Sequence, residues 1–444
     1  MKKIISMILV TVLVMSLAGC GGNTTTQNSA NPQKSDTSDN SDKSSKKEKV
    51  LLKLFTGKIE TIDVMNEIIN DFNASQDRIV VEQEYQKDAS GVLKIKLASG
   101  EVPDIVTTYE QEHVDAGVYV DLSDQSQWWD RLSDEMKQMC TDVNSGKVYR
   151  VCTNVTMAGF FYNKEIFNEL GLKTATTWDE LESNLETIKE KKSDVTPWFI
   201  FGKEAWHLGH LIEFIPHGYL KSTLGAVEAK KAMLNNDTAK LNFGAADGAM
   251  SVFASNLLKL QEKGLINSDV LTATSDNCVQ DFANGKAAML SNGMWVLSSL
   301  LEANPDIESK IGFAPYPAYM PGSKSVVLSA EDSGYSITSA CEHKEEAIEF
   351  LNFLFSAENQ KKYSELLKAP SAFKDVDAQW ASENIVNEVK TALDSAVNIG
   401  FTNEKPAGFS GDDAGRMVQE LLSGKYTAEE FAKEYEKAWN AGME

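Results

Sequence analysis

Aromatic and charged side chains stand at the ends of two segments that are predicted to be strands. Phe55 and Lys58 close the apolar segment 50–55, and Tyr109 and Glu110 close the segment 104–109. In open α/β sheets, ligands bind in the crevice outside the carboxyl ends of the strands. Flat rings cover apolar C–H faces, while carboxylates and amines bind hydroxyl groups. These residue types suit the non-covalent binding of a polyhydroxylated ring.

Motifs for covalent catalysis and for tightly bound cofactors do not occur in this sequence. There is no G-x-S-x-G elbow, no H-E-x-x-H helix, no Cys/His nucleophile arrangement and no G-x-x-x-x-G-K-[ST] loop. His207, His210 and His217 fit no familiar zinc spacing, and no cysteine lies near them. We therefore expect no metal ion and no cofactor.

The elements that must position these residues alternate between strand and helix. Strands are predicted at 50–55, 79–85 and 104–109, and helices at 61–72 and 92–98. The second helix is predicted to end at Gly100. This order and spacing indicate a parallel sheet with right-handed crossovers.

The alternation continues through the rest of the chain. Further strands are predicted at 149–152, 159–162 and 198–201, and long helices at 244–263 and 344–355. Two capping boxes, Thr177 with Glu180 and Thr427 with Glu430, are each predicted to start a helix. The fold class is therefore α/β.

The first fifty residues are predicted to lie outside the folded body. Two lysines precede the apolar stretch 4–17, which is too short to span a bilayer and is typical of a signal peptide. Leu17-Ala18-Gly19-Cys20 resembles the lipobox of bacterial lipoproteins, which implies a signal peptide over 1–19 and a lipid on Cys20. Residues 20–49 are almost free of apolar side chains, so we expect a disordered tether.

Charge and cysteine content limit the possible partners. The chain carries 65 acidic and 43 basic residues, a formal charge of −22, which argues against nucleic acid as a partner. Besides Cys20 there are four cysteines, of which only Cys140 and Cys152 lie near each other. A disulfide is permissible outside the cell, and a pair of buried thiols is an equally good interpretation.

Several ordered motifs resemble family 1 extracellular solute-binding proteins, which serve ABC importers. The chain matches their typical stretches from about residue 50 to 370, in the right order and behind a lipobox. The matching stretches are ASGEVPDI at 98–105, YNKEIF at 162–167, GL at 171–172, TWDE at 177–180, FANGKAAM at 282–289, GMW at 293–295, IGFAPYP at 311–317 and the helix pair 347–360.

This resemblance implies a two-lobed periplasmic-binding-protein type II fold, similar to that of maltose-binding protein. The ligand cleft would lie between two lobes that are joined by a multi-strand hinge. The chain would cross between the lobes near 153–159, 331–335 and 368–371. Residues 50–155 plus 333–369 would form lobe 1, and 156–332 plus 370–444 would form lobe 2.

The resemblance also implies further ligand-binding residues. Trp295 matches the cleft tryptophan that stacks on a sugar ring, and Glu204 and Trp206 follow a strand where the family places an acid and an aromatic residue. Glu331 and Asp332 lie on the implied return crossing, where they could bind hydroxyls or cap the hinge backbone. Phe409 lies where the family often supplies a last aromatic residue.

The implied function is the capture of a sugar or oligosaccharide by hinge closure and its delivery to the transmembrane subunits of an ABC permease. We expect a monomer, anchored through its lipid on the extracellular face of the cell membrane, or on the periplasmic side if the cell has an outer membrane. Three alternatives stay open: an exported carbohydrate-active enzyme, a binder of a non-sugar solute, and an adhesin or sensor partner. A glycosidase needs two carboxylates, which so acidic a chain always offers, so their presence decides nothing.

Overall fold

A computed structural model describes residues 49–142, 144–400, 406 and 408–443 of the protein. These residues belong to one compact unit, Glu48–Glu444. The predicted signal peptide, Cys20 and almost all of the predicted tether lie outside the described residues. No helix in the described ranges is both long and apolar enough to cross a bilayer.

The N-terminal strands form the predicted parallel sheet. Strand β1 (Val50–Thr56) lies between β2 (Ile79–Tyr85) and β3 (Ile105–Val106), parallel to both. Helices α1 (Ile62–Ser75) and α2 (Ala89–Ser99) form the crossovers. The predicted apolar face of α1 is buried, and Gly100 ends α2 with a φ of 80°, which glycine adopts readily.

Strand β3 is shorter than predicted. The segment 104–109 was expected to be a strand throughout, but only Ile105 and Val106 pair in the sheet. Tyr109 leaves the sheet and stacks on Tyr119, with ring centroids 5.5 Å apart.

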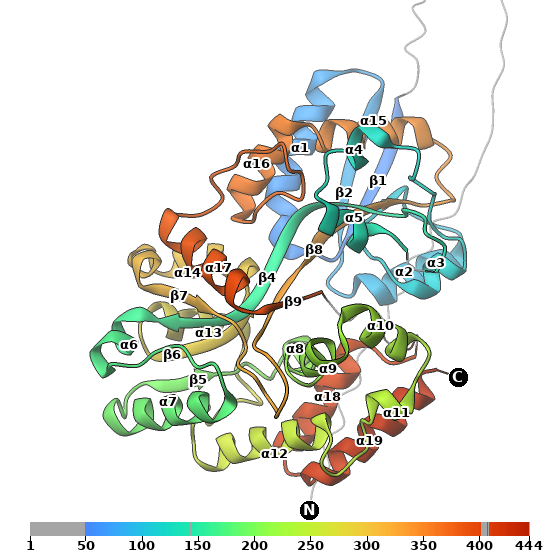
Figure 1. The fold of residues 1–444 in the computed structure, drawn as a ribbon. Helices are drawn as coiled ribbons and strands as arrows, with labels where there is room; N and C mark the ends of the chain where they lie inside the picture. Colours follow the sequence, from blue (N-terminus) through green and yellow to red (C-terminus); the bar gives the residue numbers. More distant parts are fainter. Residues whose placement is uncertain (1–48, 143, 401–405, 407, 444) are drawn as a thin grey trace, which may run out of the picture. The chain divides into compact units, whose positions relative to one another are not determined.

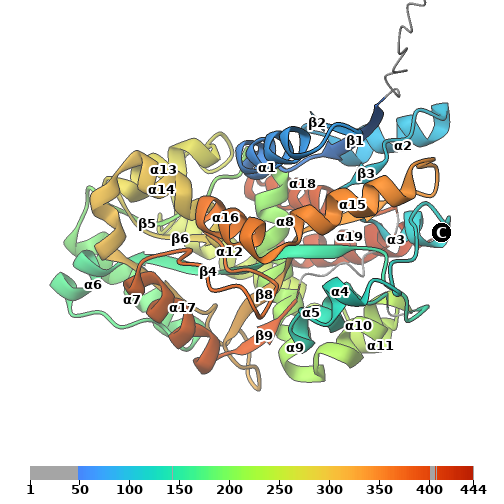
Figure 2. The same ribbon diagram turned by 90° about the horizontal axis from the view of Figure 1, so that it is seen from above.

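Two long antiparallel strands, β4 (Val151–Asn163) and β8 (Val326–Ile337), run through the whole sheet (Figure 1, Figure 2). The predicted strand residues 151–152 and 159–162 both belong to β4, which begins at Val151 and is continuous where the sequence pattern predicted a gap. Its middle contains the polar residues Thr153, Asn154 and Thr156, which the sequence pattern treats as a break. All three are buried, and this part of β4 is paired with β8.

The remaining strands complete the sheet beside β4 and β8. Within the described residues, nine strands join in one sheet whose main order is β2-β1-β3-β8-β4-β6-β5, while β7 pairs with β4 and β9 with β8. These strands are β5 (Thr196–Phe199), β6 (Ala287–Gly293), β7 (Ile311–Ala314) and β9 (Val397–Ile399).

Each end of the sheet has its own hydrophobic core, which defines two α/β lobes. The first core surrounds β1 and β2 and contains Phe72, Trp128 and Phe355. The second core contains Phe160 and Trp198 beside β4 and Trp439 of the last helix. Strands β4 and β8 contribute to both lobes, so the molecule has the two-lobed α/β fold that was expected.

The helices cover the faces of the two lobes (Figure 1). Both predicted capping boxes are present and start α7 and α19. The other helices and 3₁₀ turns are η1 (Ile59–Thr61), α3 (Gln111–Asp115), α4 (Ser126–Trp129), α5 (Asp134–Cys140), α6 (Lys164–Leu170), α7 (Trp178–Lys191), α8 (Ala205–Phe214), α9 (Pro216–Leu224), α10 (Ala226–Leu234), α11 (Thr238–Leu241), α12 (Ala249–Glu262), α13 (Ser275–Ala283), η2 (Met294–Val296), α14 (Leu297–Ala303), η3 (Pro305–Lys310), α15 (Lys344–Leu354), α16 (Ala357–Leu367), α17 (Glu383–Ser395), α18 (Gly411–Leu422) and α19 (Ala428–Ala441).

The predicted lobe boundaries fall on the shared elements. Residues 155/156 lie inside β4, residues 332/333 lie inside β8, and residues 369/370 follow α16. At this third position, the Val155 amide donates to the Pro370 carbonyl oxygen over 2.9 Å, so the segment after α16 runs beside β4. The exact boundaries stay a prediction.

Candidate ligand-binding site

A cavity of about 590 Å³ lies where the two lobes meet β8. Its size is within the range of small-molecule binding pockets. One wall comes from the first lobe, the opposite wall from α8, β6 and α14, and the floor from residues 331–334 of β8. The lining residues are Gly57, Lys58, Ile59, Glu60, Tyr85, Lys87, Thr107, Arg150, Trp206, His210, Ser275, Asn292, Trp295, Val296, Ser299, Glu331, Asp332, Ser333 and Gly334.

Two half-buried indoles form the aromatic part of this cavity. Trp206 begins α8 and lies edge-on to Phe201, with ring centroids 5.4 Å apart. Trp295 follows β6 in the turn η2. The ring of His210 lies between them, 5.4 Å from Trp206 and 5.8 Å from Trp295. Such rings offer apolar faces to a ligand while the cavity stays open to solvent.

Gly293 makes room for the Trp295 indole. The indole folds back over the end of β6, and a Cβ atom at position 293 would overlap three of its ring carbons. A glycine two residues before the tryptophan is therefore a steric requirement for this orientation of the ring.

Paired charges form the polar part of the cavity. Lys58 is ion-paired with Asp332 and lies 3.9 Å from Glu60. Asp332 also accepts a hydrogen bond of 3.2 Å from the Asn154 amide. Burial lowers the pKa of Lys58 and outweighs the opposing effect of Glu60. Asp332, one of the two acidic residues predicted from the hinge, is therefore held at the cavity surface by Lys58 and Asn154.

Arg150 supports the second acid of the hinge. Its guanidinium pairs with Glu331 and lies 4.2 Å from the centre of the Tyr109 ring. Burial is the largest single effect and works against the charge of Arg150, but Glu331 together with Cys152, Cys140 and Tyr109 outweighs it, so the pKa of Arg150 is raised. Burial likewise raises the pKa of Tyr109 to about 12, against the effect of Arg150. Gly334 lies so close to the Arg150 side chain that a Cβ there would come within 3.0 Å of its Cδ.

Five of the ten residues predicted to bind the ligand line this cavity, namely Lys58, Trp206, Trp295, Glu331 and Asp332. Their contact with a ligand stays a prediction. The structure places the other five elsewhere. Phe55 is fully buried and packs in a small core with Leu93 and Val106, because alternate side chains of β1 point to opposite faces.

Tyr109 and Glu110 lie behind the cavity wall rather than in it. The Tyr109 ring packs between Tyr119 and Arg150. Arg150, and not Tyr109, lines the cavity. Glu110 faces Lys94, with a distance of 3.7 Å between the carboxylate and the ammonium. Neither Tyr109 nor Glu110 lines the cavity; both lie behind the residues that do.

Glu204 and Phe409 are also outside the cavity lining. Glu204 precedes α8, and its buried Oε2 has no hydrogen-bond partner among the described residues. Phe409 is 4% exposed and packs edge-on against Tyr435 and Trp439 in the core of the second lobe. Its aromatic character thus stabilises the last helix.

Sequence reasoning missed several lining residues, and three of them had a usable signal. Tyr85 and Lys87 end β2 at the same edge of the sheet as Lys58, so the rule applied to β1 and β3 would have found them. His210 lies one helical turn after Trp206 on α8 and thus on the same helix face. Arg150 precedes a strand rather than following one, and nothing in the sequence pattern points to it.

Cys140 and Cys152 are free, buried thiols with their sulfur atoms 3.4 Å apart. Cys140 is the last residue of α5, and Cys152 is the second residue of β4. Their hydrogen bond lowers the pKa of Cys140 and raises that of Cys152. Of the two interpretations that the sequence left open, the structure favours the pair of buried thiols.

The fold and the cavity define the class of this protein: a two-lobed binding protein with its candidate site at the strands that join the lobes. Comparison with known families agrees. Residues 58–361 match the family model described as bacterial extracellular solute-binding protein, which covers more than half of the chain. The chain belongs to this family, as the sequence motifs implied.

Two curated relatives are named as sugar-binding proteins. The chain is 31% identical over 346 residues to the multiple sugar-binding protein of Streptococcus mutans, covering 74% of this chain and 77% of the relative. It is 26% identical over 294 residues to the melibiose/raffinose/stachyose-binding protein MelE of Bacillus subtilis, covering 66% of each.

Solved structures of similar proteins share the fold over almost their whole length. A sugar transporter protein from Bacillus licheniformis in complex with stachyose has a TM-score of 0.74 and 25% identity, covering 88% of this chain and all of the other. The binding protein RafE in complex with raffinose has a TM-score of 0.75 and 25% identity, covering 89% of this chain and all of the other.

Proposed function

We propose that this protein is the extracellular solute-binding component of an ABC importer and that it captures a sugar or oligosaccharide in the cavity at β8. The observation that carries the proposal is the composition of that cavity. Two indoles supply apolar faces, and paired charges and amides supply hydrogen bonds from several directions. A sugar has both kinds of surface. The sugars named for the relatives and the solved structures support this choice.

The charge of the cavity supports a neutral ligand. Its lining contains three basic and three acidic side chains, apart from His210, and four of them form the two ion pairs at β8. An anionic or cationic solute would have to break one of these pairs or bring its own partner. The six residues are Lys58, Lys87, Arg150, Glu60, Glu331 and Asp332.

Capture would depend on a hinge motion at β4 and β8. A ligand that contacts both walls of the cavity favours the closed arrangement of the lobes, since only differential affinity shifts such an equilibrium. The closed protein would then dock on the permease subunits, where the sugar is released. No covalent step occurs on this chain.

The N-terminus would keep the protein at its transporter. We propose that Cys20 is lipidated after removal of residues 1–19 and that residues 20–49 form the tether at the extracellular face of the membrane. A Cys20→Ser variant should appear in the culture medium, while the parent protein stays with the membrane fraction. Equal amounts of both proteins in the medium would argue against the anchor.

A thermal-shift screen of the purified protein tests the ligand class. A ligand that binds only the native state raises the melting temperature, and at roughly 1,000 times its Kd the gain is about 4 kcal/mol. Melibiose, raffinose and stachyose should raise it, while amino acids, polyamines and phosphorylated solutes should not. A hit only among the latter would contradict the sugar assignment, and chromatographic recovery of cleaved sugar would indicate an enzyme.

A further inference from the structure

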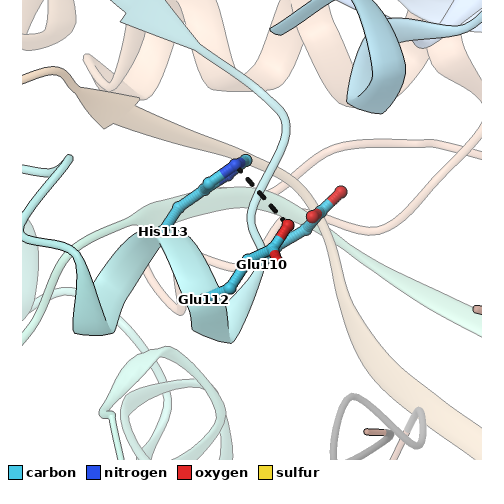
Figure 3. A group of neighbouring side chains, drawn as sticks. All are labelled: Glu110, Glu112 and His113. Carbon is cyan, nitrogen blue, oxygen red and sulfur yellow. Dashed lines mark ion pairs between the residues drawn. The ribbon is translucent and has the colours of Figure 1, made fainter. Parts of the chain in front are cut away.

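Three side chains with metal-ligating atoms converge just behind the cavity wall (Figure 3). Glu110 precedes α3, while Glu112 and His113 belong to it. One ligating atom from each residue lies within 4.8 Å of the others, and no other such group of three occurs among the described residues. From the sequence we expected no metal ion, since His207, His210 and His217 fit no familiar zinc spacing.

Hydrogen bonding around His113 fixes which ring nitrogen carries the proton. The Tyr119 hydroxyl donates its single hydrogen to the Thr108 carbonyl oxygen over 2.9 Å. Its contact of 3.2 Å with His113 Nδ1 therefore needs Nδ1 to be the donor. In the neutral ring, Nε2 is then left with a free lone pair. A metal-ligating histidine commonly donates its other ring N–H to an oxygen acceptor, and the Tyr119 hydroxyl oxygen is the acceptor here.

The free lone pair of Nε2 points toward a carboxylate. His113 has a side chain only 6% exposed, and its Nε2 lies 3.9 Å from Glu112 Oε1. In a neutral His113 ring this lone pair would repel the carboxylate oxygen, and a positive charge between the two groups, either a proton on Nε2 or a cation, would relieve the repulsion.

Lys94 supplies part of that positive charge from α2. Its ammonium lies 2.7 Å from the Glu112 carboxylate and 3.7 Å from that of Glu110. This pairing lowers the pKa of Glu112. The Lys94 side chain is 51% exposed, so it can rotate into solvent. The single charge of a lysine ammonium balances only one of the two carboxylates, whereas a divalent metal ion would balance both and would also use the imidazole nitrogen.

We propose that Glu110, Glu112 and His113 bind a divalent transition-metal ion, with zinc as the reference ion. Two carboxylate oxygens and one imidazole nitrogen suit zinc and its neighbours better than magnesium or calcium, which prefer oxygen ligands alone. Ligands about 2.0–2.1 Å from a tetrahedral zinc ion lie about 3.3 Å apart. The separations here exceed this by less than about 1.5 Å, a movement that the partly exposed glutamates can make by side-chain rotation.

Such a site would brace the wall of the sugar cavity without touching the sugar. His113 bonds to Tyr119, Tyr119 stacks on Tyr109 at an interplanar angle of 14°, and Arg150 lies over Tyr109. Arg150 lines the cavity and pairs with Glu331. The metal would therefore hold the segment that supports Arg150. The proposal goes beyond sugar binding and holds or fails independently of it.

Calorimetric titration of zinc chloride into protein freed of metal by EDTA tests the site. We expect one zinc ion per chain and no comparable heat with magnesium. Glu112→Gln should weaken zinc binding by roughly tenfold or more, since even groups that only orient a ligand are worth about 10- to 100-fold. Lys94→Gln should strengthen it, because the competing ammonium is gone. Both side chains are partly exposed, so the variants should fold.

Glu346→Gln is the matched control. Glu346 Oε2 lies 3.9 Å from His343 Nδ1, the same separation as in the proposed site, but the pair has no third ligand among the described residues. This variant should bind zinc like the parent protein. Absence of stoichiometric zinc binding in the parent would overturn the proposal. An unchanged affinity in Glu112→Gln, or an X-ray absorption spectrum of the zinc complex without an imidazole ligand, would overturn it as well.

Discussion

At the scale of single residues, the orientation of Trp295 depends on the absence of a side chain at position 293. Gly293→Ala would place a methyl group where the indole lies, so the ring must move. Overpacking of this kind costs about 1–3 kcal/mol. We expect the variant to bind sugar at least several-fold more weakly in a fluorescence titration, although residue 293 is not in the cavity lining.

Gly400→Ala serves as the control for this change. No described atom lies within 4 Å of a Cβ built at Gly400, and its φ lies outside the left-handed region. This variant should keep the affinity of the parent protein. Equal affinities in both alanine variants would show that the position of the indole does not matter for binding.

The buried pair of Arg150 and Glu331 gives a second prediction at this scale. Their side chains are 14% and 6% exposed, so Glu331→Gln leaves a buried guanidinium without its carboxylate partner. Breaking a buried pair in this way costs about 3–5 kcal/mol of unfolding free energy. Urea denaturation should detect this loss.

An exposed pair of the same residue types provides the comparison. Arg78 and Glu349 are 60% and 43% exposed, so Glu349→Gln should cost less than about 1 kcal/mol. If the two glutamine variants were equally stable, the Arg150 pair would not be buried in solution.

The sequence predicted which residue types occur near the cavity better than it predicted which side chains point into it. The rule for strand ends found Lys58, but it also selected Phe55, which points to the opposite face of β1. Alternation along a strand decides which of two neighbours faces the site, and the chain pattern alone does not fix that phase. Arg150 reaches the cavity through tertiary packing on Tyr109, which no local pattern encodes.

At the scale of elements, Glu182 joins two helices of the second lobe. It lies on α7 and accepts hydrogen bonds of 2.8 Å from Lys259 on α12 and 2.7 Å from Lys263 at its end. Burial alone would raise the pKa of Glu182, but the two lysines outweigh it and hold the pKa below its usual value.

A pH dependence of stability follows from this lowered pKa. A group whose pKa is lower in the folded than in the unfolded protein contributes stability above its usual pKa and loses it as pH falls through the folded value. Glu182→Gln should therefore cost about 2 kcal/mol at pH 7. The difference from the parent should begin to shrink near pH 4.5, the usual value for glutamate, and continue to fall below it. Urea denaturation at pH 7, 5 and 3.5 measures this, and a constant difference would contradict it.

Elements with strong local signals were predicted well, and the hinge strands were not. The apolar face of α1 and the two capping boxes depend on residues a few positions apart, so the sequence contains their full description. In β4, the buried polar side chains of Thr153 and Asn154 donate hydrogen bonds to Ser333 and Asp332 of β8, some 180 residues away. A local pattern therefore places a break where the structure has a continuous strand.

At the scale of the whole molecule, two strands that belong to both lobes account for the position of the candidate site. Strands β4 and β8 pair along the middle of the sheet, and residues 331–334 of β8 form the cavity floor between the two walls. A ligand held there contacts residues of both lobes and of the hinge at once. Binding and closure would therefore be coupled in the proposed mechanism.

The most direct test of this account is calorimetric titration of the purified protein with the neutral oligosaccharide that gives the largest thermal shift. We predict one site per chain. Trp295→Ala should weaken binding by about 2 kcal/mol or more, as the loss of a buried aromatic anchor does. Trp129→Ala, which removes an indole packed on the core of the first lobe, should leave the affinity unchanged. Equal affinities in the parent and Trp295→Ala, or no saccharide binding at all, would contradict the assignment of the cavity as a sugar site.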